Sequence, residues 1–331
     1  MLTMADIESQ TTADLRAGLP FRGWLLVKEA TTRQTANGKS FLDLRLVDSY
    51  GTIPAKAWEY EKGLEPSVGT ILWIEGSGNL YNGHLQLRVD RFRFATPADG
   101  KSPADFMPHA PETPETMLEE IRETVAHFSD PSLRNILAKL LEWANADGRL
   151  LTAPAARTLH HAELGGLLYH TITILRAAKA LMTVYRGLDR DLLYAGIIAH
   201  DLAKLDEMRT NELGLVDDYS VDGNLIGHIV RGIVNIERAA GEVGANRERA
   251  TLLQHLVLSH HGKPEFGSPV RPAVPEALIL SALDCLDAHL YQINSTLKTL
   301  QPGQFSPPVW GLENTKVYRP VGENADAAIR P

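Results

Sequence analysis

The chain has 331 residues, more than one hydrophobic core usually organises, so we expect two or more domains. Its 44% hydrophobic and 22% charged residues indicate a folded protein, and the single cysteine, Cys285, excludes an internal disulfide framework or a zinc site built on several thiolates. The net charge of −8 argues against a protein that coats duplex nucleic acid, although it leaves room for a local basic groove.

The N-terminal sequence, MLTMADIESQ, is acidic where a signal peptide would be basic and then apolar. No stretch of the chain approaches the roughly 18 consecutive apolar residues of a membrane span. We therefore predict a cytoplasmic protein with no membrane partner.

Residues 15–97 contain short segments in which apolar and polar residues alternate, separated by the turn signals NGK, SYG and YNG. None of these segments has a helical period. Five strands in so short a stretch are typical of a small closed barrel, and we predict an all-β OB-fold domain here. The expected strands cover residues 21–30, 40–48, 52–60, 70–80 and 84–94.

The second and third strands are expected to present aromatic and basic side chains on the outer face of the barrel. Leu42, Leu44 and Leu46 alternate inward, which leaves the intervening positions outward. OB barrels stack bases and hold the nucleic-acid backbone on such a face. The candidate nucleic-acid-binding residues are Phe41, Arg45, Lys56 and Trp58. The alternative is that another domain covers the two aromatic side chains.

The pattern changes after the barrel. Residues 98–114 are rich in proline and have neither a helical nor a strand period, so we predict a linker. Over residues 115–300 apolar residues recur at three- and four-residue intervals, which predicts an all-α helical bundle. The Pro- and Gly-rich tail, residues 301–331, is expected to follow an extended path over the surface.

Several helical segments carry a histidine or an aspartate where the apolar pattern points inward. A lone buried histidine is usually hydrogen-bonded to backbone or to a carboxylate, but a series of such residues indicates a shared ion. Imidazole and carboxylate without thiolate suit Mn²⁺, Fe²⁺, Mg²⁺ or a catalytic Zn²⁺, and converging helices are where bundles build such sites. The candidate metal ligands are His170, His200, Asp201, His228, His260, His261 and Asp284.

The stretch GIIAHDLAKL, residues 196–205, places His200 and Asp201 side by side in an apolar run that we predict to be helical. Burying such groups unpaired is costly, and coordination of a cation would offset that cost. Neighbouring helical residues point about 100° apart, so the two side chains can grip one ion from two sides. Lys204 lies one turn on, along the same face; the alternative is a surface lysine that ends a helix.

Other polar residues near these positions have no settled role. His160, His161 and Glu163 are expected upstream on the helix of His170, as substrate contacts or as a helix-terminus cap. Lys263 lies in a loop that follows two candidate ligands. It would either face the scissile strand or be a solvated loop lysine.

The order of the candidate ligands resembles that of the HD-domain metal-dependent phosphohydrolases: His, His-Asp, His, His-His and Asp on successive helices. HDLAK is similar to that family's His-Asp-x-Gly-Lys, with Ala203 in place of the glycine. The resemblance implies that one ion is held by His170, His200, Asp201 and Asp284. It implies a second ion, bridged by Asp201, for His228, His260 and His261, although spare histidines of this family can contact phosphate instead. Asp287, three residues on, competes with Asp284.

This resemblance also implies a mechanism of phosphoester hydrolysis. Divalent ions activate water for attack on phosphorus near neutral pH. Asp201 would bridge the ions or orient the nucleophile, and Lys204 would stabilise charge on the phosphoryl oxygens. These two are therefore the candidate catalytic residues.

Over roughly residues 15–320 the chain is similar to the YhaM-type 3′–5′ exoribonucleases. The strings that carry this likeness include GKSFLDLRLVD, HHAELGGLLYHT, GNLIGHI and, most distinctive, LSHHGKPEFGSP. The resemblance implies 3′–5′ polarity and a preference for Mn²⁺, with Fe²⁺, Mg²⁺, Co²⁺ or Zn²⁺ as alternatives and one or two ions in the site.

We therefore predict a metal-dependent 3′–5′ exonuclease that hydrolyses single-stranded RNA to mononucleotides, with DNA as an alternative substrate. Two other hypotheses stay open. One is an HD-type phosphohydrolase of a small nucleotide, regulated by the barrel, and the other is a non-catalytic single-strand-binding protein. The sequence leaves the oligomeric state open.

Overall fold

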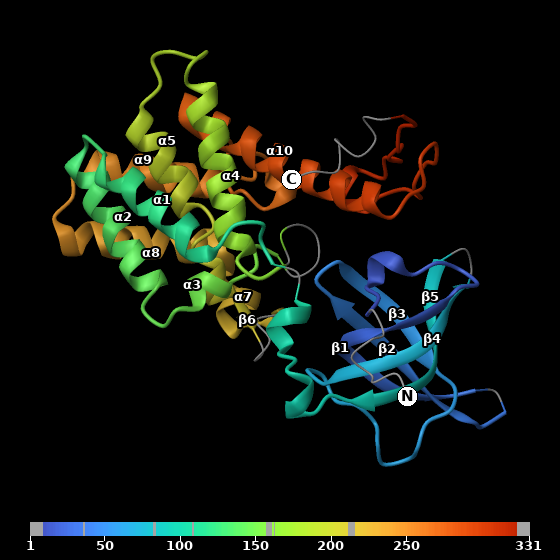
Figure 1. Cartoon of the computed structure of the whole chain (residues 1–331). Coiled ribbons are helices and arrows are strands. Elements are labelled where there is room, and N and C mark those ends of the chain that lie inside the picture. The colour runs from blue at the N-terminus through green and yellow to red at the C-terminus, as the bar shows by residue number, and fades with distance from the viewer. Residues whose placement is uncertain are drawn as a thin grey trace. The chain divides into compact units, whose positions relative to one another are not determined.

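A computed structural model describes residues 9–35, 37–81, 84–107, 109–156, 161, 163–210 and 216–322. The chain divides into two compact units, Met1–His109 and Ala110–Pro331, each with its own hydrophobic core. The N-terminal unit runs from blue to teal in Figure 1, and the C-terminal unit from green to red. His160 lies outside the described residues.

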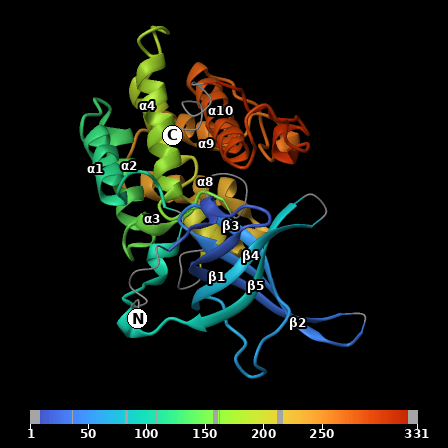
Figure 2. The ribbon, with the colours of Figure 1, turned by 45° about the vertical axis from the view of Figure 1, so that its right-hand side comes forward.

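The N-terminal unit is a closed barrel with the strand order β1-β2-β3-β5-β4. Its strands are β1 (Pro20–Gln34), β2 (Ser40–Asp48), β3 (Gly51–Ala57), β4 (Ile71–Tyr81) and β5 (His84–Phe94). The pair β3–β5 is parallel and the other pairs are antiparallel. In Figure 2 the β1–β2 and β4–β5 hairpins extend beyond the barrel. The predicted OB-fold barrel is confirmed.

The inward face of the barrel follows the alternation in the sequence. Leu42, Leu44 and Leu46 are buried, as are Ile53 and Ala55 on β3. Between Glu75 and Gly76 of β4 the register skips Asp90 of β5, so β5 bulges there, and a Cβ at Gly76 would lie 2.1 Å from the Arg88 carbonyl oxygen. Only glycine allows that approach.

Part of the segment expected to be a linker is packed. It contains the short 3₁₀ helices η3 (Pro97–Asp99) and η4 (Pro103–Phe106), and η4 contacts β1 and β2. Phe106 and Met107 are buried, because these large apolar side chains gain from leaving water. Residues 98–107 therefore belong structurally to the barrel unit, although they have no regular hydrophobic period.

The C-terminal unit is a helical bundle with one small hairpin, β6 (Met208–Thr210) and β7 (Val216–Tyr219), that the sequence pattern did not predict. Proline begins α1, α2 and α10, where its missing N–H costs nothing. The helices are α1 (Pro114–Ala126), α2 (Pro131–Ala144), α3 (Arg149–Thr152), α4 (Gly166–Leu181), α5 (Arg190–Ala199), α6 (Lys204–Glu207), α7 (Val221–Leu225), α8 (Gly227–Val243), α9 (Arg247–Ser259) and α10 (Pro275–Lys298).

Two helices are shorter than the sequence predicts. Gly165, with φ of 73°, caps α4, so His161 and Glu163 precede this helix and do not lie on it. The predicted helix through residues 196–205 ends at Ala199 and resumes as α6 at Lys204. Among the described residues, no helix is both long and apolar enough to cross a membrane.

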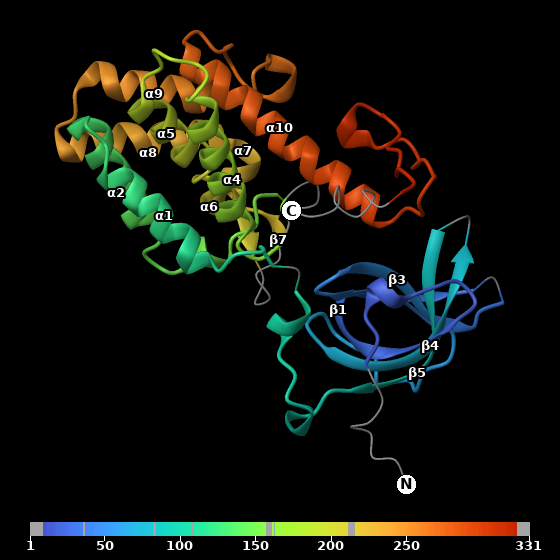
Figure 3. The ribbon, with the colours of Figure 1, turned by 45° about the horizontal axis from the view of Figure 1, so that its top comes forward.

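The described part of the tail, residues 301–322, folds back on itself. Isolated bridges join Phe305 to Tyr318 and Val309 to Thr315. Leu312 and Val317 form a small buried cluster with Leu297 of α10. Figure 3 shows this folded tail beside the C-terminal end of α10, so residues 301–322 do not follow the extended path that we expected for the tail. The few apolar residues of the tail suffice to close it over the helix end.

Candidate metal centre

The His200–Asp201 pair lies in a tight turn between α5 and α6. The Lys204 N–H donates to the Asp201 carbonyl at 2.9 Å, and Leu205 and Asp206 repeat this three-residue spacing. In a 3₁₀ turn, side chains three residues apart eclipse. As a result the Lys204 ammonium lies 2.6 Å from Asp201 Oδ2.

One group of candidate ligands surrounds the Oδ2 side of Asp201. His170 Nε2, from α4, lies 3.3 Å from His200 Nε2 and 3.7 Å from Asp201 Oδ2. Asp284 Oδ1, from α10, lies 3.2 Å from the same His170 nitrogen. His200 Nε2 is 3.4 Å from Asp201 Oδ2. The structure thus brings together the four residues that the resemblance assigned to one ion.

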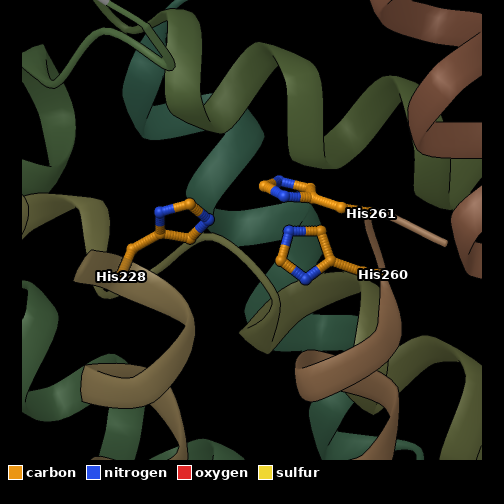
Figure 4. Close-up of side chains that lie close together, drawn as sticks. All are labelled: His228, His260 and His261. Carbon is orange, nitrogen blue, oxygen red and sulfur yellow. The ribbon is translucent and has the colours of Figure 1, made fainter. Parts of the chain in front are cut away.

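A second group faces the other oxygen of Asp201. His228 Nε2, at the start of α8, lies 3.5 Å from Asp201 Oδ1, and His260 Nε2, just after α9, lies 3.8 Å from it. The ring of His261 is 4.2 Å from that of His260 between centroids. In Figure 4 the three imidazoles gather around one space from two separate helices. Their candidate ligand nitrogens all lie within 4.8 Å of one another.

The buried polar atoms of this second group test whether a cation fits. Asp201 Oδ1, His228 Nε2 and His260 Nε2 are buried and have no hydrogen-bond partner among the residues that the structure describes. Buried polar atoms are normally paired, and three unpaired acceptors that converge on one point are explained by a shared cation. The donor set of imidazole and carboxylate therefore fits a divalent metal ion.

Each imidazole is held from behind through Nδ1. His200 and His260 contact the carbonyls of Ile197 and Val257, three residues back, both at 2.7 Å. An acceptor at Nδ1 fixes the proton there and leaves the Nε2 lone pair free for a metal. Nδ1 of His170 contacts Asp287 at 2.7 Å, and Nδ1 of His228 contacts Glu207 at 3.1 Å. Nδ1 of His261 contacts the Phe266 carbonyl at 2.9 Å.

These contacts separate the roles of the two aspartates on α10. Asp284 faces Nε2 of His170, the side toward the other ligands. Asp287 Oδ2 faces Nδ1 of His170 and also lies 2.9 Å from His161 Nε2. Asp284 is therefore the better placed ligand, and Asp287 orients the imidazole of His170.

A buried chain of hydrogen bonds continues away from Asp287. His161 Nδ1 lies 3.2 Å from Glu163 Oε1, and the Tyr291 hydroxyl donates to Glu163 Oε2 at 2.5 Å. Tyr291 is one turn beyond Asp287 on α10. We call the series Tyr291, Glu163, His161 and Asp287 the His170 relay. It ties the segment before α4 to α10 behind a candidate ligand.

The charges of the centre favour a cation. Burial alone would raise the pKa of the Asp201 carboxyl, but Lys204 and His200 hold that pKa well below its usual range. Burial, with repulsion from His200, lowers the pKa of His260 well below its usual value. Burial also opposes the charged form of His170, but Asp284 and Asp287 outweigh it and raise the pKa to about 9. The centre thus offers ionised carboxylates and, at His260, a neutral imidazole, whereas His170 holds a proton that a bound ion would displace.

Exposure is uneven across the centre. His170, His200, His260 and Asp201 form a floor that is at most 2% exposed. Partly exposed side chains form a rim: Lys204, His228, His261 and Asp284. A substrate therefore meets the rim first.

Lys204 also lines a cavity of about 670 Å³ in the same unit. Arg149, Arg209 and Arg231 line it too, together with Asp206 and Asp222, so basic groups outnumber acidic ones. This volume is within the range of small-molecule sites and is ample for a phosphate group.

The candidate residues on the barrel form a cation–aromatic cluster. The Phe41 and Trp58 rings stack with centroids 4.6 Å apart, and Lys56 Nζ lies 5.4 and 5.8 Å from them. The expected open face of Phe41 needs correction, because this side chain is only 7% exposed and Trp58 is 40% exposed. Arg45 is exposed and pairs with Glu29 at 3.4 Å.

Several residues of the barrel cluster and of the metal centre were not predicted from the sequence. Tyr81, at the end of β4, places its ring 5.4 Å from Lys56 Nζ, which only barrel closure brings about. Glu207 holds His228 although the two are far apart in sequence. A usable signal existed for Tyr291, since Asp284, Asp287 and Tyr291 recur at three- and four-residue spacing on one helix face.

Known proteins match this chain over almost its whole length. The HD domain family model matches residues 167–289, which include every candidate metal ligand. The 3′–5′ exoribonuclease YhaM of Listeria monocytogenes serotype 4b is 38% identical over 323 residues, 97% of this chain and 99% of that protein. The chain belongs to the YhaM family of 3′–5′ exoribonucleases. YhaM of Shouchella clausii is 39% identical over 92% of this chain and 95% of its own length.

The HD domain of this YhaM-family chain is that of a divalent-metal-dependent phosphohydrolase, and its His/Asp clusters agree with that chemistry. His161 and Tyr291 lie outside the matched residues. Among solved structures, the second OB-fold domain of replication protein A from Methanococcus maripaludis aligns at 20% identity and a TM-score of 0.23. That alignment covers 26% of this chain and 93% of the domain.

Proposed function

We propose that this chain is a metal-dependent exonuclease that degrades single-stranded RNA from the 3′ end to mononucleotides. The observation that carries the proposal is the position of Asp201, whose two oxygens face two separate groups of imidazoles. The proteins named YhaM to which it is similar are 3′–5′ exoribonucleases. A cytoplasmic location is part of the proposal.

Two ions are proposed, with Mn²⁺ preferred. Bound divalent ions supply an activated water nucleophile and neutralise charge on the phosphoryl oxygens. The first ion would be held by His170, His200, Asp201 and Asp284. The second would be held by His228, His260, His261 and the other oxygen of Asp201.

This chain's own residues do the rest. Asp201 draws the two groups of ligands together, while backbone carbonyls and carboxylates fix each imidazole through Nδ1. Lys204 is held by Asp201 at the rim and presents its ammonium where phosphoryl charge accumulates.

We assign residues 15–97 to binding the single strand, residues 98–114 to the connection and residues 115–300 to hydrolysis. Trp58 and Tyr81 would stack bases, Lys56 and Arg45 would hold the backbone, and Phe41 would support Trp58 from below. Lys263 would contact the strand near the metal centre.

The test is a time course on a 5′-labelled single-stranded oligoribonucleotide with the metal-stripped chain. We expect no cleavage in EDTA and, after Mn²⁺ is added, a descending ladder with release of mononucleotides. Asp201→Asn should reduce the rate at least a thousandfold, because it removes the shared charge. Glu248→Gln, an exposed change in the first turn of α9, is the control and should cleave normally.

Substrate range separates the remaining alternative. If the chain hydrolysed nucleoside triphosphates but left the oligoribonucleotide uncleaved, the result would contradict the proposed exonuclease function and favour a small-nucleotide phosphohydrolase. A ladder that persists in Asp201→Asn would overturn the role of the centre.

A further inference from the structure

The loop after His261 leaves a large aromatic side chain in water beside the metal centre. Phe266 is 58% exposed and belongs to the 3₁₀ helix η5 (Pro264–Phe266). The hydrogen bonds that Phe266 makes within the loop use its backbone N–H and carbonyl, so they do not require a phenyl ring at this position.

This loop is fixed to a candidate ligand. Nδ1 of His261 contacts the Phe266 carbonyl at 2.9 Å, and the His261 N–H donates to Ser268 Oγ at 3.0 Å. Ser268 is fully buried. Gly262 and Gly267, with φ of 77° and 103°, make the turns that bring the two ends of the loop together. The backbone of Phe266 is therefore tied directly to His261, a residue of the rim.

A cation accompanies the ring. Lys263 Nζ lies 5.6 Å from the centroid of Phe266. An exposed aromatic face with an adjacent ammonium is the combination by which proteins hold single-stranded nucleic acid: the ring stacks on a base and the cation meets the backbone. Lys56 with Trp58 and Tyr81 repeats this combination on the barrel.

We propose that Phe266 is the stacking platform for the 3′-terminal base of the strand, and that Lys263 contacts the adjoining backbone phosphate. The inference rests on the proposed exonuclease function, because such an enzyme must hold the terminal nucleotide while the preceding phosphodiester reaches the metal centre. Stacking accepts any base, so the platform gives position without sequence preference. Phe266 is a positioning residue.

The first test compares two 5′-fluorescein oligoribonucleotides, one with an ordinary 3′ end and one whose last nucleotide is abasic. Binding to the full chain is measured by fluorescence anisotropy in EDTA. Phe266→Ala should weaken binding of the ordinary oligomer about tenfold and leave the abasic oligomer unchanged. Phe266→Trp should restore binding. Phe305→Ala, which removes a phenyl ring 64% exposed in the tail, is the matched control.

The second test uses turnover with Mn²⁺. Phe266→Ala should raise KM for the ordinary oligomer about tenfold and leave kcat and the hydrolysis of bis(p-nitrophenyl) phosphate, which has no base, unchanged. Lys263→Ala should weaken both oligomers equally and reduce the slope of log affinity against log salt by about one, unlike the exposed Lys316→Ala.

Two results of the anisotropy comparison would overturn the proposal: equal loss of binding for the ordinary and abasic oligomers in Phe266→Ala, or no loss for either. Loss of bis(p-nitrophenyl) phosphate turnover in this variant would also contradict it, since the ring would then support the centre itself. If the unaltered chain leaves RNA intact with Mn²⁺, the proposed function fails, and the anisotropy comparison still decides whether Phe266 holds a terminal base.

Discussion

Asp48 of the barrel and Asp201 of the helical unit are both buried, but the two carboxylates are used in opposite ways. In the barrel, Asp48 accepts hydrogen bonds from the Thr12 N–H and hydroxyl, both at 2.6 Å, and from the N–H groups of Tyr50 and Gly51. In the helical unit, Asp201 is as deeply buried, but its Oδ1 has no hydrogen-bond partner in the described part of the chain.

The contrast shows that the hydrogen-bond partners of a buried carboxylate indicate its role. A carboxylate whose oxygens are saturated by backbone donors stabilises the fold. A carboxylate left short of donors, and faced by imidazole lone pairs, is complete only when a cation binds. The carboxylate of Asp48 is therefore satisfied within the barrel itself, whereas we expect the carboxylate of Asp201 to be satisfied by a bound cation.

Removal of the fully hydrogen-bonded carboxylate, Asp48, should have the largest effect on stability. Asp48→Ala should lower the free energy of unfolding by about 3 kcal/mol, because several donors lose a charged acceptor at once. Chemical denaturation followed by fluorescence measures this. Bis(p-nitrophenyl) phosphate turnover by the folded fraction should stay the same. Asp90→Ala, on an exposed ion pair with Arg88, is the control and should change stability little.

Metal addition tests the unsaturated carboxylate. Free Mn²⁺ at one hundred times its Kd should stabilise the unaltered chain by about 2.7 kcal/mol, since the ion binds only the folded state. Asp201→Asn should lose this response, and the metal-free variant should unfold more readily than the metal-free unaltered chain, because Lys204 loses its buried carboxylate partner. Thermal melts with and without EDTA measure both effects. A full Mn²⁺ response in Asp201→Asn would contradict the bridging role.

The His170 relay should affect metal binding although it lies behind the candidate ligands. His161→Gln should weaken Mn²⁺ binding about tenfold, because Asp287 loses a partner and His170 its fixed orientation. Isothermal titration of the metal-stripped chain measures the affinity. His127→Gln, at an exposed helix end, should bind Mn²⁺ normally. An unchanged affinity in His161→Gln would leave the relay with a purely structural role.

The smallest expected effect lies on the barrel surface. Trp58→Ala should weaken binding of a single-stranded oligoribonucleotide by about 1 kcal/mol, roughly fivefold, because one stacking face is lost. Hydrolysis of bis(p-nitrophenyl) phosphate should not change. Tyr50→Ala, at an exposed ring elsewhere on the barrel, should bind normally. Fluorescence anisotropy distinguishes the two variants, and equal losses in both would reject the cation–aromatic cluster as the binding face.

Sequence alone determined much of this protein. Alternation with a period of two located the five strands and the inward leucines, because pleating fixes which side chains share a face. The series of candidate metal ligands could also be predicted, since a histidine or aspartate at an inward helical position contradicts the apolar pattern. Helix ends were less legible: a left-handed glycine caps α4, and a 3₁₀ turn splits the helix expected at residues 196–205.

Only the tertiary structure shows which side chains from distant parts of the chain contact one another. Asp284 lies against Nε2 of His170, and Asp287 lies against Nδ1 of the same ring. The three-residue spacing of the two aspartates on a helix does not predict which of them takes which nitrogen. The tertiary structure also laid Trp58 over Phe41 and brought Tyr81 to Lys56. These facts depend on long-range packing and side-chain direction, whereas periodicity along the chain reports only which way a residue faces within its own element.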